Sequence, residues 1–289
     1  MPLTTAEAFN QFKEKLLLTV PQNNLIKSRR TTVAGYLAES FSDTSDLSLS
    51  TTTVIGSASR STIIRPLDDI DILAIFNNKN EIFERLYRDN SQKFLYRIRD
   101  ALNKYKVEVV GARGQAVRLF YKQAPHVDIA PVFRWSSGGY ALPNGTGGWL
   151  TTDPDAHEMW INQRHGELSN RLKPMIRMIK RWNNVHSKYL KGFHLEVMLA
   201  NVFTSIGGDS RDACAKFFQW GQSHLNVPDP AGHSVDLSAY LSHSARTNLL
   251  SNMRSAQNRA AQANAAEAEG NHQEANRIWR IVFGDEFPS

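Results

Sequence analysis

The sequence predicts an α+β fold with two lobes, in which a mixed sheet flanked by helices is followed by a helical C-terminal lobe. Short apolar runs that alternate or are β-branched occur between residues 51 and 133, as strands require. Longer runs with helical spacing occur before and after them. A segment rich in Gly and Ser at 136–148 is the best candidate for a linker or lid, so we expect lobes at residues 1–148 and 149–289.

Two helices are predicted at the N-terminal end of the first lobe. Thr4 and Glu7 have the spacing of a capping box, which starts a helix. Apolar residues then recur at helical spacing until Pro21, which we expect to end this helix. A second helix is expected on the apolar stripe formed by Ile26, Val33, Leu37 and Phe41.

A phosphate-binding turn is predicted where the first strand ends. Val54 and Ile55 are apolar and β-branched and follow three threonines, which is typical of a short strand. Gly56 then allows close backbone approach to a ligand, and Ser57 offers a hydroxyl to a phosphate oxygen. The small residues that follow can open a helical turn whose N–H groups bind an anion. Arg60 can bind the same negative charge of the phosphate.

Two carboxylates are predicted to share one face of the next strand, residues 69–76. Side chains alternate across a strand, so Asp69 and Asp71 lie on one face and the isoleucines that follow each of them lie on the other. Asp68 falls in the preceding loop or on the apolar side and is not expected to be a ligand. Such a pair suits Mg²⁺, which prefers oxygen ligands and keeps coordination positions for substrate phosphates.

Asp128 is the candidate for a third carboxylate. It is a lone acid in the apolar, strand-like run 126–133, and the run 117–121 just before it also alternates. An unpaired Asp buried in a sheet is costly unless something compensates its charge, and a metal would do so. A two-metal site needs such a further carboxylate, and Asp128 supplies it if its strand pairs beside 69–76. An Asp-x-Asp pair alone is most often a solvated turn, but the ordered set indicates a metal-dependent nucleotidyltransferase core.

A basic face is predicted on a helix of the second lobe, residues 168–182. Lys173, Arg177 and Lys180 recur at four and three residues, so they share one side of this helix. A triphosphate would suit that face, above all Lys180, whereas an ordinary solvated stripe is the alternative. Further on, the Ala- and Asn-rich region 244–273 predicts a helix with small side chains.

The residues of this core resemble those of the bacterial CD-NTases, the cGAS/DncV-like enzymes of the polymerase-β-like nucleotidyltransferase superfamily. The resemblance spans nearly the whole chain, and its length and compact ending are most similar to the E clade. It implies a polymerase-β-like nucleotidyltransferase core braced by the N-terminal helices. The matching residues are Gly56-Ser57, Arg60, Thr62, Asp69-Ile70-Asp71, Asp128, 148–154 with His157, 172–174, 179–183, 193–196 and 278–284.

The resemblance also implies a reaction. Such enzymes condense nucleoside triphosphates into a cyclic di- or oligonucleotide and release pyrophosphate at each bond. The product is a second messenger that a separate effector protein reads in CBASS anti-phage defence. Two Mg²⁺ ions, for which Mn²⁺ can substitute, serve as cofactors in this mechanism, and no obligatory nucleic-acid activator is expected.

Roles for the catalytic residues follow from the resemblance by position. Ser57 would contact the donor triphosphate, and Lys180 would reach its phosphates. Asp69 and Asp71 would bind both metals. Asp128 would bind the metal nearer the acceptor hydroxyl and favour the deprotonation of that hydroxyl.

An aromatic residue for base stacking is implied in the same way. Phe193 would stack on the donor base, a contact worth about 1–3 kcal/mol per base. Several relatives carry a serine just before this aromatic residue to bind phosphate, whereas this chain has Gly192. A water molecule or Lys191 would have to replace that hydroxyl.

Two other functions remain open at this point. A simpler nucleotidyltransferase of the same superfamily, which modifies RNA, a protein or a small molecule, would use the same three carboxylates. A nucleotide- or RNA-binding module without catalytic activity is the second alternative. The retained acids argue against that module, because inactive relatives of enzymes commonly lose their metal ligands.

Composition limits the remaining possibilities. A net charge of +6 and a pI of about 9.4 suit a nucleotide pocket and also weak nonspecific binding of nucleic acid. The one cysteine, Cys214, excludes a disulfide within the chain and a Cys-rich zinc site. No apolar run approaches transmembrane length and no signal-peptide core is found at the N-terminus, so we expect a cytoplasmic protein without membrane contact.

Overall fold

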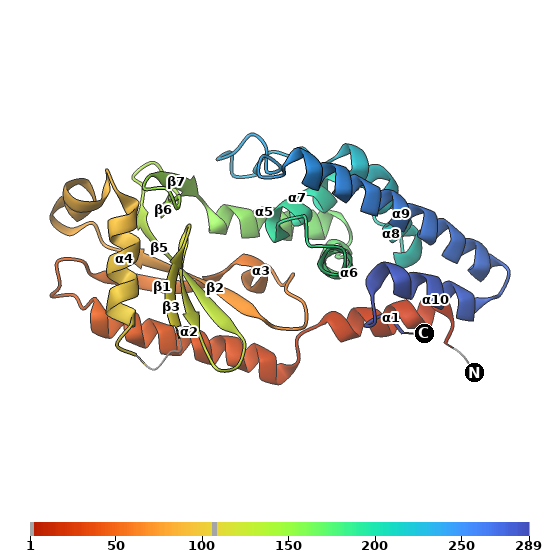
Figure 1. The fold of residues 1–289 in the computed structure, drawn as a ribbon, viewed down its shortest axis with the longest axis horizontal. Helices are drawn as coiled ribbons and strands as arrows, with labels where there is room; N and C mark the ends of the chain where they lie inside the picture. The colour runs from red at the N-terminus through yellow and green to blue at the C-terminus, as the bar shows by residue number, and fades with distance from the viewer. Residues whose placement is uncertain (1–2, 106–108, 289) are drawn as a thin grey trace. The chain divides into compact units, whose positions relative to one another are not determined.

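The computed structural model describes residues 3–105 and 109–288, and the chain divides into two compact units (Figure 1). The helical unit comprises Met1–Leu17, Ser61–Arg65 and Glu158–Ser289. The sheet unit comprises Leu18–Arg60 and Pro66–His157. The first helix and the short segment Ser61–Arg65 therefore belong to the same unit as the C-terminal helices. A single boundary at residue 148 does not describe this division, because the chain passes between the units more than once.

The sheet unit contains a mixed sheet, as predicted. Among the described residues, five strands follow the order β1-β2-β5-β4-β3, with β6 paired to β5 and β7 paired to β6. The pair β2 and β5 is parallel and the other pairs are antiparallel. The strands are β1 (Leu49–Ile55), β2 (Asp69–Phe76), β3 (Val109–Arg113), β4 (Ala116–Phe120), β5 (His126–Arg134), β6 (Tyr140–Pro143) and β7 (Trp149–Thr152).

Helices cover the sheet within the same unit. The long helix α2 contacts β1, and α4 contacts β3 and β4. The expectation that Pro21 ends the first helix is wrong, because Pro21 lies in the first turn of α2, where its missing N–H leaves no helical bond unmade. The helical segments are α2 (Val20–Ser40), α3 (Gly56–Ser59), α4 (Ser91–Leu102), the 3₁₀ turn η1 (Lys79–Glu81) and the π turn η2 (Phe83–Tyr87).

Residues 136–148 do not form a linker or lid, which corrects the sequence interpretation. Tyr140–Pro143 is the strand β6, which pairs with β5 on one side and β7 on the other. The glycines mark the turns at each end of this strand, since Gly138, Gly139, Gly145 and Gly147 have positive φ angles. A strand of four residues is too short to show the alternation that would have revealed it.

The helical unit begins and ends with the termini of the chain. The predicted capping box at Thr4 and Glu7 is confirmed and starts the first helix. Phe9 of that helix packs edge-on against Trp279, with ring centroids 5.0 Å apart, and so joins the first and last helices. The helices are α1 (Thr5–Leu16), α5 (Pro154–Glu167, in this unit from Glu158 onward), α6 (Leu172–Val185), α7 (Gly192–Val202), α8 (Ser210–Trp220), the 3₁₀ turn η3 (Gly221–Ser223), α9 (His243–Ala268) and α10 (His272–Phe283).

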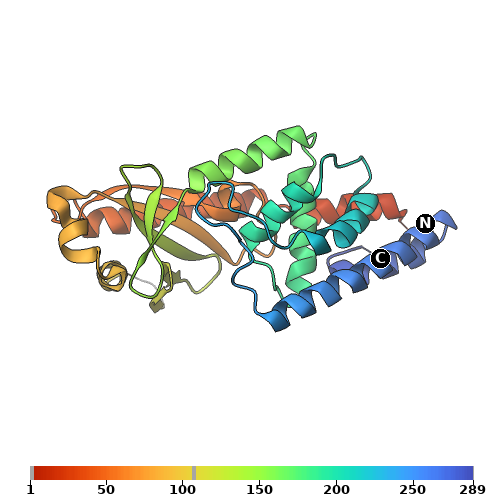
Figure 2. The same cartoon turned by 90° about the horizontal axis from the view of Figure 1, so that it is seen from above.

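Two predicted helices differ from their expected bounds. The helix expected over 168–182 is α6, which begins only at Leu172 because Ser169 and Asn170 take positive φ angles in the turn before it. The small-residue helix expected in 244–273 is α9, whose buried alanines pack within this unit, and Figure 2 shows α9 beside α10. Within the described part of the chain, every helix is too short or too polar to cross a membrane.

Candidate active site

One row of side chains crosses three neighbouring strands of the sheet unit. Asp71 of β2 pairs with Asp128 of β5, and Asp128 pairs in turn with Arg118 of β4. These three side chains are partly exposed, whereas Ile70 and Ile72 on the opposite face are buried. The predicted alternation of β2 and the predicted pairing of the Asp128 strand beside it are both confirmed.

The Gly-Ser turn lies against the central carboxylate of this row. Gly56 follows β1 directly, opens the short helix α3 and has a φ of +72°. A Cβ atom at this position would lie 2.2 Å from Oδ2 of Asp71, so a larger residue cannot take its place without moving the carboxylate. Ser57 is the next residue of the same helical turn. The structure therefore brings the predicted phosphate turn and the predicted carboxylates into contact.

Asp71 occupies an environment that disfavours its negative charge. Burial is the largest cause, and the negative charges of Asp69 and Asp128 add to it, so the pKa of Asp71 is raised from 3.8 to about 6. Arg60 and Arg118 act in the opposite direction but do not cancel the effect. The three acids therefore form one cluster of mutually repelling charges, as a cation site requires before its cation binds.

Arg118 forms ion pairs with two acids of this cluster. Its Nε donates to Oδ1 of Asp128 at 2.6 Å, and its Nη2 donates to Oδ2 of the same carboxylate and, at 3.3 Å, to Oδ2 of Asp69. Sequence reasoning assigned no function to Arg118. The signal was present, because a lone arginine in an apolar strand is as unusual as the lone Asp128.

The donor set of this cluster fits a divalent cation. Three carboxylates supply the oxygen ligands that Mg²⁺ and Mn²⁺ prefer, and the pKa of Asp71 stays raised despite the charges of Arg60 and Arg118. In the described part of the chain, no three acidic, histidine or cysteine side chains are already gathered around one point as a metal site. Two of the three carboxylates, those of Asp128 and Asp69, are paired with Arg118 instead.

Lys180 lies in the helical unit and is buried, so the interpretation of its face as a solvated stripe is wrong for this residue. Its Nζ donates to Oε1 of Glu196 at 2.6 Å and to the backbone oxygen and Oγ1 of Thr62 at 3.1 Å each. The Thr62 hydroxyl donates in turn to Oε1 of Glu196 at 2.7 Å. We call these three residues the buried triad.

The other basic residues of α6 also make contacts within the helical unit. Nη1 of Arg177 donates to the backbone oxygen of Ser61 at 2.8 Å, and Nζ of Lys173 donates to Oδ1 of Asn162 at 2.6 Å. Through Arg177 and the buried triad, α6 holds the segment Ser61–Arg65. In the sequence this segment separates the Gly-Ser turn from the Asp-x-Asp strand.

Phe193 stands at the start of α7, also in the helical unit, and is partly buried. The residue before it, Gly192, faces Lys180, because a Cβ atom at position 192 would lie 3.9 Å from Nζ of that lysine. The departure from the family pattern therefore falls beside the buried triad. The stacking and phosphate-binding functions of Phe193 and Lys180 remain predictions.

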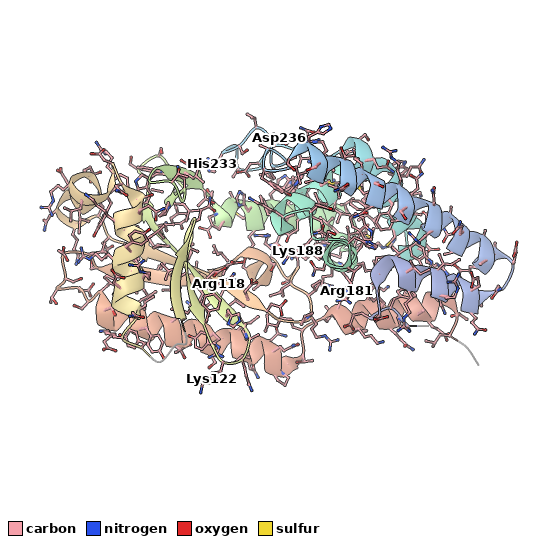
Figure 3. The ribbon with its side chains drawn as sticks, viewed as in Figure 1. Arg118, Lys122, Arg181, Lys188, His233 and Asp236 are labelled. Atoms are coloured by element: carbon pink, nitrogen blue, oxygen red, sulfur yellow. The ribbon has the colours of Figure 1, made fainter. Side chains whose placement is uncertain are left out.

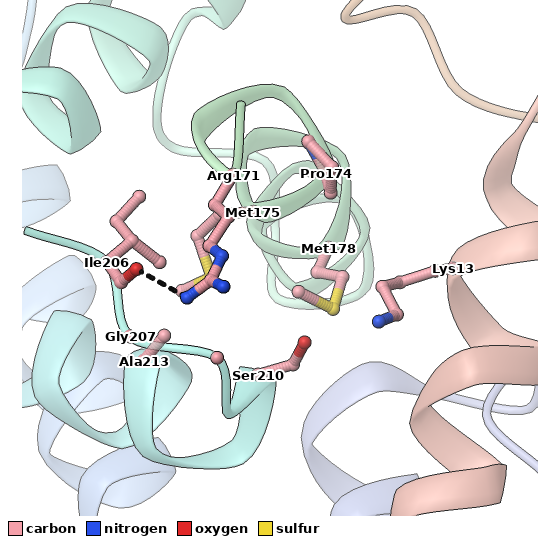
Figure 4. Close-up of a pocket in the computed structure, with 10 residues that line it drawn as sticks. Lys13, Arg171, Pro174, Met175, Met178, Ile206, Gly207, Ser210 and Ala213 are labelled. Atoms are coloured by element: carbon pink, nitrogen blue, oxygen red, sulfur yellow. Dashed lines mark hydrogen bonds between the residues drawn. The ribbon is translucent and has the colours of Figure 1, made fainter. Parts of the chain in front are cut away.

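A cavity of about 160 Å³ lies elsewhere in the helical unit (Figure 4). Two of its lining residues are basic, Lys13 and Arg171, and Nη1 of Arg171 donates to the backbone oxygen of Ile206 at 3.1 Å. None of the predicted site residues lines it. Its lining consists of Lys13, Arg171, Pro174, Met175, Met178, Ile206, Gly207, Gly208, Ser210 and Ala213.

Comparison with known proteins identifies the family to which this site belongs. Residues 3–165, more than half of the 289-residue chain, match the model of the SMODS family, the Second Messenger Oligonucleotide or Dinucleotide Synthetase domain. The chain belongs to the SMODS family. This SMODS protein is therefore a nucleotidyltransferase that synthesises second-messenger oligonucleotides or dinucleotides, as the resemblance implied.

Two curated proteins are similar to it over most of their length. A probable cyclic nucleotide synthase of Bacillus cereus is 26% identical over 269 residues, which cover 81% of each chain. A cyclic AMP-AMP-AMP synthase of an Acinetobacter strain is 26% identical over 257 residues, which cover 81% of this chain and 71% of the relative.

Solved structures confirm the fold. CdnC of E. coli MS115-1 with ATP matches with a TM-score of 0.78 at 19% identity and covers 99% of each chain. The cyclic AMP-GMP synthase DncV of Vibrio cholerae matches with a TM-score of 0.77 at 14% identity and covers 99% of this chain and 98% of its own. At these identities the likeness concerns the fold, which is the predicted α+β nucleotidyltransferase fold.

Proposed function

We propose that this SMODS protein condenses nucleoside triphosphates into a cyclic di- or oligonucleotide, with pyrophosphate released at each bond. The observation that carries the proposal is the pairing of Asp71 with Asp128 directly beside Gly56. A phosphate-binding turn next to converging carboxylates is what in-line attack on an α-phosphate needs. The names of the two curated relatives, both cyclic nucleotide synthases, support a cyclic product.

Asp69, Asp71 and Asp128 would hold divalent cations at this site. Two such ions, Mg²⁺ or Mn²⁺, supply charge that stabilises the attacking and leaving oxygens of the displacement. The protein itself positions the reactants: Ser57 and the N–H groups of α3 orient the donor triphosphate, and Arg60 adds positive charge next to α3. Asp128 favours loss of the proton from the acceptor hydroxyl.

Two residues of the helical unit are also proposed to bind the donor nucleotide. Lys180 would contact the donor phosphates by exchanging one of the three bonds that its ammonium group makes to Glu196 and Thr62. Phe193 would stack on the donor base. The partial burial of its ring at the first turn of α7 leaves part of its surface for such a contact.

The product would act in CBASS anti-phage signalling, in the cytoplasm, through a separate effector protein. Its substrates are nucleoside triphosphates, in keeping with relatives solved with ATP and with GTP. One relative, CdnC, has been solved as a complex with HORMA-deltaN, so regulation by a protein is compatible with this fold. We propose no obligatory nucleic-acid activator.

The double variant Asp69→Asn, Asp71→Asn tests the catalytic proposal. Purified protein is incubated with four nucleoside triphosphates and Mg²⁺, and phosphatase-resistant products are separated and identified by mass spectrometry. We expect the wild type to form such products without any added acceptor and the double variant to form none. Asp68→Asn is the matched control, because Asp68 is exposed, precedes β2 and should leave synthesis unchanged.

Two outcomes would contradict the proposal. Unchanged synthesis by the double variant would exclude these carboxylates from the reaction. Incorporation of nucleotide only after RNA, protein or a small-molecule acceptor is added would assign the chain to the simpler class of nucleotidyltransferase.

A further inference from the structure

We propose that Arg118 is the internal counterion of the metal-free active site and that it competes with divalent cations for the carboxylates of Asp128 and Asp69. The inference rests on the proposed function, because it assumes that these carboxylates hold the metal. It adds a control on metal binding that is built into β4. Arg118 is thus a positioning residue for the carboxylates, and its release accompanies the entry of the metal.

The geometry of the contact is that of a strong ion pair. Nε and Nη2 of Arg118 donate to the two different oxygens of Asp128, which is the bidentate fork that arginine forms with carboxylates. Nη2 also reaches Oδ2 of Asp69 at 3.3 Å. One guanidinium therefore bridges two of the three predicted metal ligands.

Metal and guanidinium need the same atoms. Both oxygens of Asp128 accept from N–H groups of Arg118, so a cation that coordinates Asp128 shares these oxygens with the guanidinium, and its charge repels that of Arg118. The pairing of β4 with β5 sets Arg118 directly opposite Asp128, so the guanidinium stays close to the carboxylate after release. We therefore expect Arg118 and the metal ion to compete directly for the Asp128 carboxylate, which is a larger effect than a change of charge far from the site.

The contact is open enough to exchange. The exposed fractions of the side chains are 23% for Arg118, 21% for Asp128 and 52% for Asp69, so water and ions reach all three. Phe120 lies two residues along the same face of β4, with its ring centroid 5.8 Å from the guanidinium carbon of Arg118. The ring offers the displaced guanidinium a cation–π contact.

Binding of Mn²⁺ alone, without nucleotide, tests this inference on the full-length protein. The dissociation constant is measured by isothermal titration calorimetry for the wild type, Arg118→Gln, Arg118→Lys and Lys122→Gln. Lys122 is the matched control, because it is exposed and follows β4 (Figure 3). Its replacement by Gln removes one positive charge, as Arg118→Gln does, but leaves the bonds to the carboxylates in place. Thermal unfolding of each variant without metal confirms that it is folded.

We expect Arg118→Gln to bind Mn²⁺ about tenfold more tightly than the wild type, which corresponds to about 1.4 kcal/mol. Arg118→Lys should lie between them, because lysine keeps the charge but not the fork. Lys122→Gln should stay within about twofold of the wild type. Without metal, Arg118→Gln should unfold at a lower temperature at pH 8, because its carboxylates lose their counterion.

The opposite results separate the inference from the function on which it rests. If Arg118→Gln binds Mn²⁺ no more tightly than Lys122→Gln, or more weakly than the wild type, then Arg118 does not compete with the metal. The site itself still stands in that case, provided that Asp71→Asn abolishes Mn²⁺ binding. If wild-type binding of Mn²⁺ is absent or insensitive to Asp71→Asn, the metal site of the proposed function fails, and the inference fails with it.

Discussion

Two ion pairs of this molecule use the same kinds of groups in opposite surroundings. In the helical unit, Lys180 and Glu196 pair at 2.6 Å with side-chain exposures of 10% and 0%. In the sheet unit, Arg118 and Asp128 pair with exposures of 23% and 21%, and Asp69, which shares the arginine, is 52% exposed. The first pair is closed from solvent, whereas the second is open to ions and ligands.

The difference shows which charged group can exchange its partner. Removing one member of a buried pair leaves an uncompensated charge in a medium that solvates it poorly, so a closed pair holds its position. An open pair loses little when an ion or water replaces its partner. We therefore assign a supporting function for the segment Ser61–Arg65 to the buried triad, and the proposed exchange of cations to the cluster around Asp71.

The largest expected effect is the loss of stability on breaking the closed pair. Lys180→Met should lower the free energy of unfolding by about 3–5 kcal/mol, because Glu196 remains buried without its counterion. Urea unfolding followed by circular dichroism measures the change. Lys216→Met is the matched control, since Lys216 pairs with Asp212 at 2.6 Å on α8 in the same unit but in the open, and it should cost less than about 1 kcal/mol.

A double variant separates the structural function of Lys180 from its proposed contact with phosphate. Lys180→Met, Glu196→Leu replaces both charges by apolar groups, which is often close to neutral, and should recover most of the stability that Lys180→Met loses. If its KM for nucleoside triphosphates still rises, Lys180 contacts the donor. A double variant as unstable as Lys180→Met would show that the charge of Glu196 was not the cause.

An effect of intermediate size is expected from pH at the open cluster of the metal-free protein. Because the pKa of Asp71 is raised from 3.8 to about 6, the folded state binds its proton more tightly than the unfolded state does. The contribution of Asp71 to the free energy of unfolding is therefore most favourable below pH 4. It falls as the pH rises from 4 to 6 and stays constant above that. The loss amounts to about 2–3 kcal/mol.

Denaturant unfolding at pH 4.5 and pH 7.5, with metal removed by chelation, measures this effect. Asp71→Asn should remove the difference between the two pH values, since asparagine does not titrate in this range. Addition of Mn²⁺ at pH 7.5 should restore stability to the wild type alone. An Asp71→Asn variant with the same pH dependence as the wild type would assign the effect to other acids.

The contrast between the two clusters also shows how far the sequence alone could lead. Asp69, Asp71 and Asp128 were predictable because each is a polar exception within an apolar strand whose period is two. The partner of Asp128 was not, because Arg118 becomes its neighbour only through the register of a hairpin, which the pattern of residues in either strand does not express.

The buried triad was less accessible to sequence reasoning for the same physical reason. Lys180 and Glu196 lie on different helices, and Thr62 is 118 residues from Lys180, so the packing that buries them together has no local signature. A helical period identified the basic face of α6 but could not tell a solvated face from one satisfied by a buried acid. The strand β6 was not predicted from the sequence, because four residues are too few to show a clear alternation of apolar and polar side chains.

The smallest expected effect concerns the neutral member of the buried triad. Thr62→Val keeps the shape of the side chain and the backbone oxygen but removes the hydroxyl that donates to Glu196 and accepts from Lys180. We expect a loss of about 1–2 kcal/mol in the free energy of unfolding, because two bonds to buried charges disappear while the ion pair and the bond from Lys180 to the Thr62 backbone oxygen stay. Thr247→Val on α9, whose hydroxyl is exposed, should change stability by less than about 0.5 kcal/mol. Equal values for the two variants would mean that the hydroxyl of Thr62 adds nothing to the closed pair, and that Lys180 and Glu196 hold the segment Ser61–Arg65 without it.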